Sequence, residues 1–142
     1  MTHEYGPAAT PRVGVGVLVL NEHGEVLLTL RRRPPEVGCW SIVGGKVEFM
    51  ECLEDAARRE AFEESGLHVE PVRLLCVTDH LLPDEGDHWV SPAYLARIVG
   101  GKLCNTEPDK TEAVRFFSLD GLPDNLTLTA RGAVAALLQE NA

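Results

Sequence analysis

Apolar runs and alternating apolar and polar positions predict a chain of several strands. Residues 13–20 form an eight-residue apolar run of the length of a buried strand, and the turn at 21–24 leads into a second strand at 25–31. Further strands are predicted at 69–80 (in one or two pieces), 89–99 and 114–119. Pro92 indicates an edge strand or a bulge within its run. The acidic turn at 82–87 has the composition of a mobile lid.

Two helices interrupt this pattern. Residues 53–65 are rich in Ala, Arg and Glu and contain neither Pro nor Gly. Cys52 occupies the N-cap position, with Asp55 three residues later as a weak capping box, and Gly66 supplies a left-handed stop. An apolar stripe of small residues would let this helix lie close to a sheet: Leu53, Ala57 and Ala61. The second helix is expected at 129–140, with four residues facing inward: Ala133, Ala136, Leu137 and Leu138.

This order of elements predicts an α/β fold in which a mixed sheet lies between two helices. Residues 1–12 have no periodicity and are expected to form a flexible N-terminal arm, followed by a single domain over 13–142. Gly14 and Gly16 do not begin a dinucleotide fingerprint, because no GxGxxG follows them. We expect these glycines to allow close packing under the first helix.

The charge narrows the range of partners. The 142-residue chain has a formal net charge of −9, which argues against a nucleic-acid backbone or an anionic membrane as the main partner. The apolar run at 13–20 is too short to span a membrane. The four cysteines have no CxxC spacing and are expected to be reduced thiols in a cytoplasmic protein. The oligomeric state stays open, with a homodimer among the options.

Three carboxylates are predicted to share one face of the first helix. Glu60, Glu63 and Glu64 are spaced i, i+3 and i+4, so that their Cβ atoms lie about 5–6 Å apart. At an effective dielectric constant of about 20, two such charges repel by roughly 3 kcal/mol. A solvated helix face would reduce this repulsion, and a bound cation would offset it. Clustered hard oxygen ligands suit Mg²⁺ or Mn²⁺.

Residues 45–67, GKVEFMECLEDAARREAFEESGL, have a more specific pattern. A glycine is followed after five residues by Glu51, and after seven more by Arg59-Glu60 and the rest of the motif. This resembles the Nudix box of the Nudix (MutT-like) pyrophosphohydrolases, and residues 40–45 resemble the W-x-L-P-G-G approach to it. Val43 replaces the usual Pro, and Met50 replaces the usual Gly. Both differences affect loop geometry and leave the carboxylates in place.

The resemblance implies the Nudix fold and assigns roles to individual residues. It implies that Glu60 and Glu64 bind Mg²⁺ or Mn²⁺, that Glu63 binds metal or activates water, and that the Gly45 carbonyl is a further ligand. Glu51 and Arg59 are expected to brace the helix and the loop. Residues 107–112 resemble an E-P-x-K-x-E segment of the nucleotide-hydrolysing branch, and Glu112 is the candidate for a further metal contact or general base. Three residues are expected to bind substrate: Arg31, Lys46 and Trp89.

The implied reaction is hydrolysis of a nucleoside triphosphate to the monophosphate and pyrophosphate. ADP-ribose or another nucleoside-diphosphate conjugate is the main alternative, because Pro83 lies sixteen residues after Leu67, where that branch has a proline. Dinucleoside-polyphosphate hydrolases have a Tyr slightly further on, and Glu85 stands there instead. Messenger-RNA decapping fits poorly with the acidic charge. A catalytically silent nucleotide-binding regulator is a third reading, although such domains usually lose box carboxylates.

Overall fold

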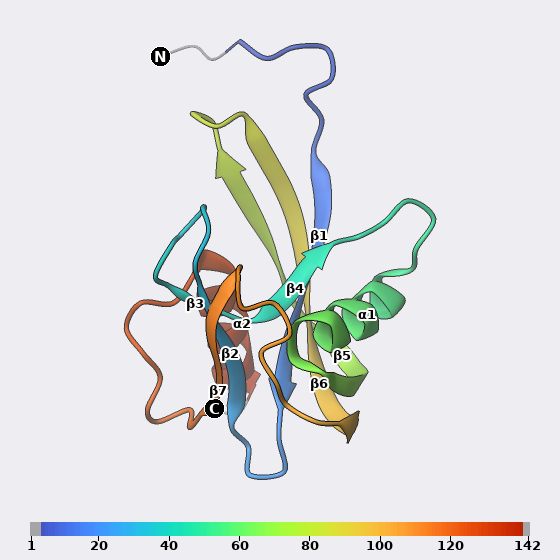
Figure 1. The fold of residues 1–142 in the computed structure, drawn as a ribbon. Coiled ribbons are helices and arrows are strands. Elements are labelled where there is room, and N and C mark those ends of the chain that lie inside the picture. Colours follow the sequence, from blue (N-terminus) through green and yellow to red (C-terminus); the bar gives the residue numbers. More distant parts are fainter. Residues whose placement is uncertain (1–3, 141–142) are drawn as a thin grey trace.

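Strand β1 (Arg12–Leu20) lies in the interior of a seven-stranded mixed sheet in the computed structural model, which describes residues 4–140 (Figure 1). The other strands are β2 (Val26–Arg31), β3 (Trp40–Ser41), β4 (Val43–Lys46), β5 (Leu67–Leu82), β6 (Asp87–Gly101) and β7 (Thr111–Phe117). The main strand order is β3-β2-β1-β6-β5, with β4 paired to β1 and β7 paired to β2. Strands β1 and β6 are parallel, and the other pairs are antiparallel.

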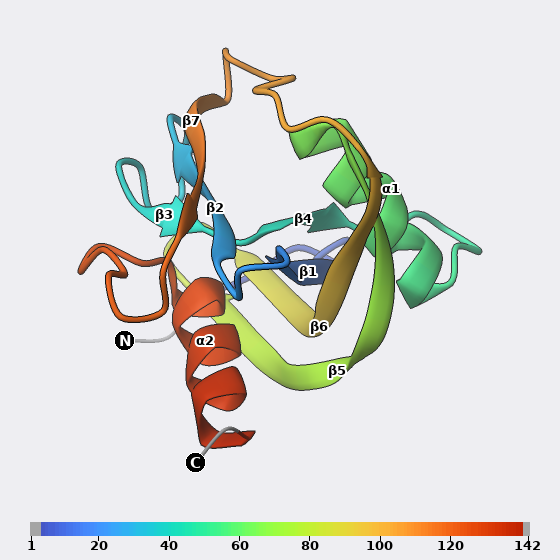
Figure 2. The same ribbon diagram turned by 90° about the horizontal axis from the view of Figure 1, so that it is seen from below.

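The alternation along β1 divides the core into two layers. Val15, Val17 and Val19 pack with the alanines of α1 (Leu53–Ser65) on one face. Leu18 packs with α2 (Leu128–Glu140) on the other. Figure 2 shows the two helices on opposite sides of the strands. The predicted α/β fold, a mixed sheet between two helices, is therefore confirmed.

The helix predictions hold except in detail. Gly66 ends α1 with a φ of 77°, and its N–H donates to the Phe62 carbonyl at 2.9 Å. The prediction of a capping box is wrong, because the Cys52 side chain makes no capping hydrogen bond. In α2, Leu137 is buried as expected, but Leu138 is 45% exposed.

Of the two readings of Pro92, the edge strand is wrong, because β6 runs between β1 and β5. The β5–β6 pairing does have a register irregularity close to Pro92. The prediction for two glycines of β1 needs correction. Gly14 and Gly16 lie on the α2 side of β1, opposite the valines that pack against α1. They are therefore not packed under α1. Gly16 instead leaves room for the Ile42 side chain, and both glycines line the cavity that opens on this face.

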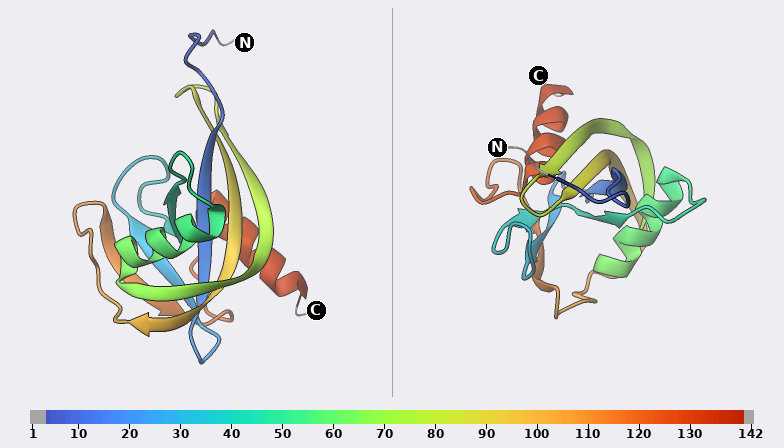
Figure 3. Two further views of the ribbon diagram at one scale, coloured as in Figure 1. Left: turned by 90° about the vertical axis from the view of Figure 1, so that its right-hand side faces the viewer. Right: turned by 90° about the horizontal axis from the view of Figure 1, so that it is seen from above.

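The hairpin of β5 and β6 projects beyond the body of the sheet (Figure 3). Its tip is the turn predicted over the acidic segment. Described residues of the expected arm, 4–11, run beside this hairpin before β1 begins. The rest of that predicted arm, residues 1–3, lies outside the described residues. Neither α1 nor α2 has the length and apolar character that a membrane-spanning helix needs.

Candidate active site

Two glycines of β4 let the carboxylate face of α1 approach the sheet closely. A Cβ on Gly45 would lie 2.5 Å from the carboxyl carbon of Glu60, and a Cβ on Gly44 would lie 2.1 Å from the Val15 carbonyl oxygen. A side chain at residue 45 would displace the Glu60 carboxylate, and a side chain at residue 44 would displace the backbone of β1. The paired glycines before the helix are thus a steric requirement of this contact.

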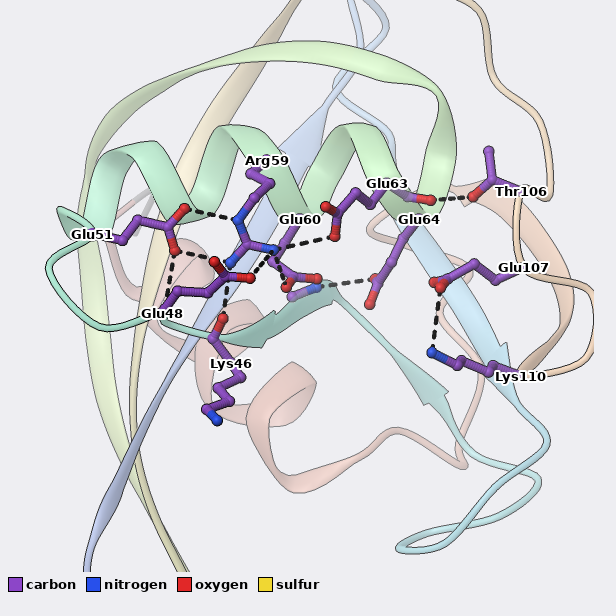
Figure 4. A network of polar contacts seen from close by, with 11 residues as sticks. Lys46, Glu48, Glu51, Arg59, Glu60, Glu63, Glu64, Thr106, Glu107 and Lys110 are labelled. Atoms are coloured by element: carbon purple, nitrogen blue, oxygen red, sulfur yellow. Dashed lines mark hydrogen bonds and ion pairs between the residues drawn. The ribbon is translucent and has the colours of Figure 1, made fainter.

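Arg59 holds together the N-terminal half of the carboxylate face (Figure 4). Its Nε and one terminal nitrogen donate to both oxygens of Glu51, at 2.7 and 2.9 Å. The other terminal nitrogen donates to Glu60 at 2.8 Å and to Glu63 at 3.2 Å. A further bond reaches the Lys46 carbonyl at 2.9 Å. One guanidinium therefore fixes the helix, the preceding loop and the end of β4.

These contacts shift the pKa values of the carboxyl groups in opposite directions. Hydrogen bonds from Arg59, together with the Glu48 backbone, lower the pKa of Glu51 to about 2. Burial raises the pKa of Glu60, and the hydrogen bond from Arg59 opposes that rise. Glu51 is thus a firmly ionised partner of Arg59, whereas burial of Glu60 works against its charged form.

Glu64 lies deeper in the site than its neighbours on α1. It accepts a hydrogen bond from the Gly44 N–H at 3.1 Å. Burial raises the pKa of Glu64 to about 8, and the negative charges of Glu60 and Glu107 add to the rise. Three carboxylates therefore crowd a partly desolvated space at the end of α1.

The loop before β7 brings Glu107 into this cluster. Thr106 donates its hydroxyl to the Glu63 carbonyl, which ties the loop to α1. Asn105 donates to the Thr111 carbonyl at 2.8 Å, and Lys110 lies 3.4 Å from the Glu107 carboxylate. Figure 4 shows Glu107 opposite Glu64, with Lys110 beside it. Sequence analysis missed Glu107 because it chose the other glutamate of the same segment.

Glu112 is not brought to the carboxylate cluster. It lies in β7 between Thr111, which lines the cavity, and Ala113, which packs against the core. Since alternate residues of a strand point to opposite faces, Glu112 points away from both, and its side chain is exposed. This alternation was readable in the sequence, and it would have favoured Glu107 in the connection before the strand.

The acidic cluster has the chemistry of a hard-cation site without a preformed cage. Within residues 4–140, no three His, Cys, Asp or Glu side chains are close enough together to hold a metal ion. Two of the predicted ligands, Glu60 and Glu63, are hydrogen-bonded to Arg59. The donor set nevertheless fits Mg²⁺ or Mn²⁺, because burial and the neighbouring carboxylates disfavour the ionised form of Glu64, and a bound cation would favour it. Mg²⁺ commonly completes its coordination with waters and substrate phosphates.

A cavity of about 450 Å³ extends from this cluster along the α2 side of the sheet. Gly14, Gly16 and Ser91 lie on the sheet side of it, and Glu64 and Glu107 lie at its acidic end. Polar residues of the other walls are Thr29, Glu36, Ser41, His80, Asp87, Thr127 and Thr129. A Cβ added to Gly14 would lie 3.5 Å from Trp89 and 3.4 Å from the Gly45 carbonyl oxygen. The absence of a side chain at residue 14 thus connects the acidic end to the tryptophan.

All three predicted substrate residues line the cavity: Arg31, Lys46 and Trp89. Arg31 donates to three loop carbonyls, those of Pro35 at 2.7 Å and of Arg33 and Pro34 at 3.2 Å. It therefore braces the loop after β2 as well as facing the cavity. The guanidinium carbon of Arg12 lies 5.7 Å from the centre of the Trp89 ring. The structure brings these residues to one cavity with Glu64, which is the one predicted metal ligand of α1 among its lining residues.

Sequence comparison matches residues 10–137 to the NUDIX domain. An archaeal relative from Methanocaldococcus jannaschii, named ADP-ribose pyrophosphatase, is 32% identical over 74% of this chain and 61% of its own length. The human 8-oxo-dGDP phosphatase NUDT18 is 35% identical over 68% of this chain and 28% of its own length. The chain thus spans less than two thirds of either relative.

Structure comparison finds the same fold in a protein of similar length. The crystal structure of a MutT NUDIX hydrolase from Burkholderia pseudomallei is 44% identical, with a TM-score of 0.82. The match covers 90% of this chain and 98% of that one.

Proposed function

Because the chain belongs to the Nudix family, we propose that it hydrolyses a nucleoside triphosphate to the monophosphate and pyrophosphate with the help of Mg²⁺ or Mn²⁺. The observation that carries this proposal is the junction of two features. An acidic cluster at the end of α1 meets a cavity whose walls also carry cationic side chains. These are Arg31, Arg33, Lys46 and Lys110. A polyphosphate needs both, since its charge is balanced by cations on the protein and by metal ions.

In this proposal the metal is held by Glu60, Glu63, Glu64 and the Gly45 carbonyl, with Glu107 as an additional acidic group. When bound, the metal neutralises the polyphosphate and polarises the attacking water. Arg59 and Glu51 hold the helix and loop in register. A carboxylate of the cluster accepts the proton from the attacking water. We replace Glu112 by Glu107 as the candidate for this step, because Glu107 lies beside Glu60 and Glu64.

The remaining walls bind the nucleoside. Trp89 offers an aromatic face for the base, and base–aromatic stacking contributes about 1–3 kcal/mol. Ser41 and Thr127 also line the cavity, and the Thr127 hydroxyl donates to the Ser41 hydroxyl at 3.0 Å. Hydroxyl groups donate or accept, so they tolerate several ligand edges. These walls do not single out one base.

ADP-ribose is the second candidate, because the Methanocaldococcus jannaschii relative is named ADP-ribose pyrophosphatase. Pro83, the residue that suggested this branch, lies at the exposed hairpin tip and does not line the cavity. The absence of a nucleic-acid partner stays a prediction, and one relative, from Edwardsiella ictaluri, is named NAD-capped RNA hydrolase NudC. The homodimer, the cytoplasmic location and the single domain with its flexible arm are likewise predictions.

Product identity tests the proposal. The purified protein is incubated with Mg²⁺ and equal concentrations of each (d)NTP, 8-oxo-dGTP, ADP-ribose or NAD-capped RNA, and the products are separated by anion exchange. We expect monophosphate and pyrophosphate from a triphosphate. ADP-ribose turnover well above every triphosphate would assign the chain to the second candidate. Nucleotide binding without any turnover would favour the silent regulator.

A further inference from the structure

The projecting end of the β5–β6 hairpin forms part of the cavity wall. His80 and Leu82 of β5, with Asp87 and Trp89 of β6, line the cavity from this end. His80 and Trp89 are direct cross-strand partners, as are Leu82 and Asp87. β1 pairs with β6 only as far as Trp89, so the hairpin has two strands beyond that residue, and a two-stranded hairpin on its own is at best marginally stable in water. The position of this wall therefore depends on what holds the projecting end.

The N-terminal segment before β1 is in contact with the hairpin tip. The Tyr5 hydroxyl donates to the Pro83 carbonyl at 2.9 Å. The Tyr5 ring would lie 3.6 Å from a Cβ on Gly86, so it packs on the turn as well as bonding to it. The hydrogen bond joins residues 78 positions apart in the chain. Figures 1 and 3 show the segment beside the projecting strands.

A second hollow, of about 320 Å³, lies between this segment and the hairpin. Tyr5, Ala9 and Pro11 line it from the N-terminal side. Leu82 and Asp87 line it from the hairpin side, and both also line the main cavity. The same two residues thus separate the N-terminal segment from the substrate space. A shift of the N-terminal segment that moves these two residues therefore changes the shape of the main cavity.

We infer that residues 4–11 act as a strap that fixes the hairpin wall of the cavity, with Tyr5 as its positioning residue. This inference rests on the proposed function, because it assigns the hairpin to substrate binding. Tyr5 does not line the main cavity. The N-terminal segment lies at the projecting end of the hairpin, away from α1 (Figure 3). The strap therefore affects nucleotide binding more than the chemical step. Its loss raises KM and leaves kcat nearly unchanged.

Three variants separate the contributions of the strap. Tyr5→Ala removes the ring and the hydrogen bond, and Tyr5→Phe removes only the hydrogen bond. Gly6→Ala is the matched control, because a Cβ there meets no atom within 4 Å. One net hydrogen bond is worth about 0.5–1.5 kcal/mol, which corresponds to roughly 2- to 13-fold in an equilibrium constant. We expect KM to rise about 3- to 10-fold for Tyr5→Ala and about 2-fold for Tyr5→Phe.

Kinetics and amide hydrogen exchange together test the inference. KM and kcat are measured with the fastest triphosphate of the panel and with ADP-ribose, and exchange is followed over residues 80–89 without nucleotide. We expect faster exchange there in Tyr5→Ala, with Tyr5→Phe intermediate and Gly6→Ala like the wild type. Unchanged exchange in Tyr5→Ala would refute the strap, whatever the substrate. Faster exchange with an unchanged KM for both nucleotides would refute the role of the strap in nucleotide binding. If neither the triphosphate nor ADP-ribose is hydrolysed, the proposed function itself is rejected.

Discussion

Arg59→Ala should destabilise the protein far more than the same change at the adjacent Arg58. The Arg59 guanidinium makes hydrogen bonds to three carboxylates and to one carbonyl. Only 25% of its side chain is exposed, and its partners Glu51 and Glu60 are 16% and 13% exposed. Removing Arg59 leaves these carboxylates together without their cation.

The magnitude follows from the degree of burial. Removing one partner of a buried ion pair costs about 3–5 kcal/mol, whereas an exposed pair contributes roughly 0–1 kcal/mol. Since Arg59 is mostly but not fully buried, we expect a loss of about 2–4 kcal/mol. At roughly 3 °C per kcal/mol for a domain of this size, Tm should fall by about 6–12 °C. Turnover should also fall, because Glu60 and Glu63 lose the group that orients them.

Arg58→Ala is the matched control on the same helix. Arg58 is 38% exposed and pairs with Glu70 at 2.6 Å and Asp55 at 3.0 Å, which are themselves 43% and 64% exposed. Its loss should cost about 1 kcal/mol. Both variants are unfolded in urea in the presence of EDTA, so that metal binding does not compensate for the missing charge. If the two losses agree within about 0.5 kcal/mol, the bracing role of Arg59 is wrong.

The pH dependence gives a second test of the same contact. The pKa of Glu51 is lowered to about 2 by Arg59, so the pair stabilises the fold fully above the ordinary value of 4.5. This stabilisation is lost as pH falls from 4.5 towards 2. The stability difference between the wild type and Arg59→Ala should therefore narrow over that window. A difference that stays constant down to pH 2.5 would contradict the assignment.

Three further substitutions test other parts of the site. The pKa of Glu64 is raised from 4.5 to about 8, so its ionisation destabilises the metal-free fold increasingly as pH rises through that window. Between pH 5.5 and 7.5, the stability of Glu64→Gln relative to the wild type should therefore increase by about 2 kcal/mol, as measured by urea unfolding in EDTA. Met50 has a φ of 69°, so Met50→Gly should raise Tm slightly by relieving about 1 kcal/mol of backbone strain. Phe49 has no positive φ, and Phe49→Gly should not raise Tm. Glu107→Gln should lower kcat at least tenfold at saturating Mg²⁺. A larger loss in Glu112→Gln than in Glu107→Gln would reverse our choice between these glutamates.

The sequence predicted the parts of the fold whose cause is local. Gly66 ends α1 because glycine adopts the left-handed conformation without strain, and the alternation of β1 follows from burial on both faces. Met50 adopts the positive φ that the usual glycine of the box would adopt without strain. In these cases a few neighbouring residues decide the outcome. Such features can therefore be predicted from the local sequence alone.

Features that depend on distant contacts were harder to predict. Periodicity gives β1 two faces but not which helix covers each, so Gly14 and Gly16 were assigned to the wrong side. Pro92 is tolerated in an interior strand because its β1 ladder is interrupted there: Val13 pairs with Val90, and the next pair is Gly16 with Ala93. Neither outcome has a signal within the segment itself. Each follows from the way the sheet is assembled.

The same division explains why the reaction class is easier to infer than the substrate. The carboxylates lie on a single helix, and their approach to the sheet requires glycines just before it, so most of the chemistry is encoded in one continuous motif. Glu107 joins them from a separate loop, and the nucleoside walls come from β2, β3, the β5–β6 hairpin and the start of α2. Cavity shape therefore depends on strand register, hairpin position and loop contacts such as those of Arg31. Changes in those walls can alter the accepted nucleoside while every residue of the motif is retained, which is why substrate preference must be sought in the walls.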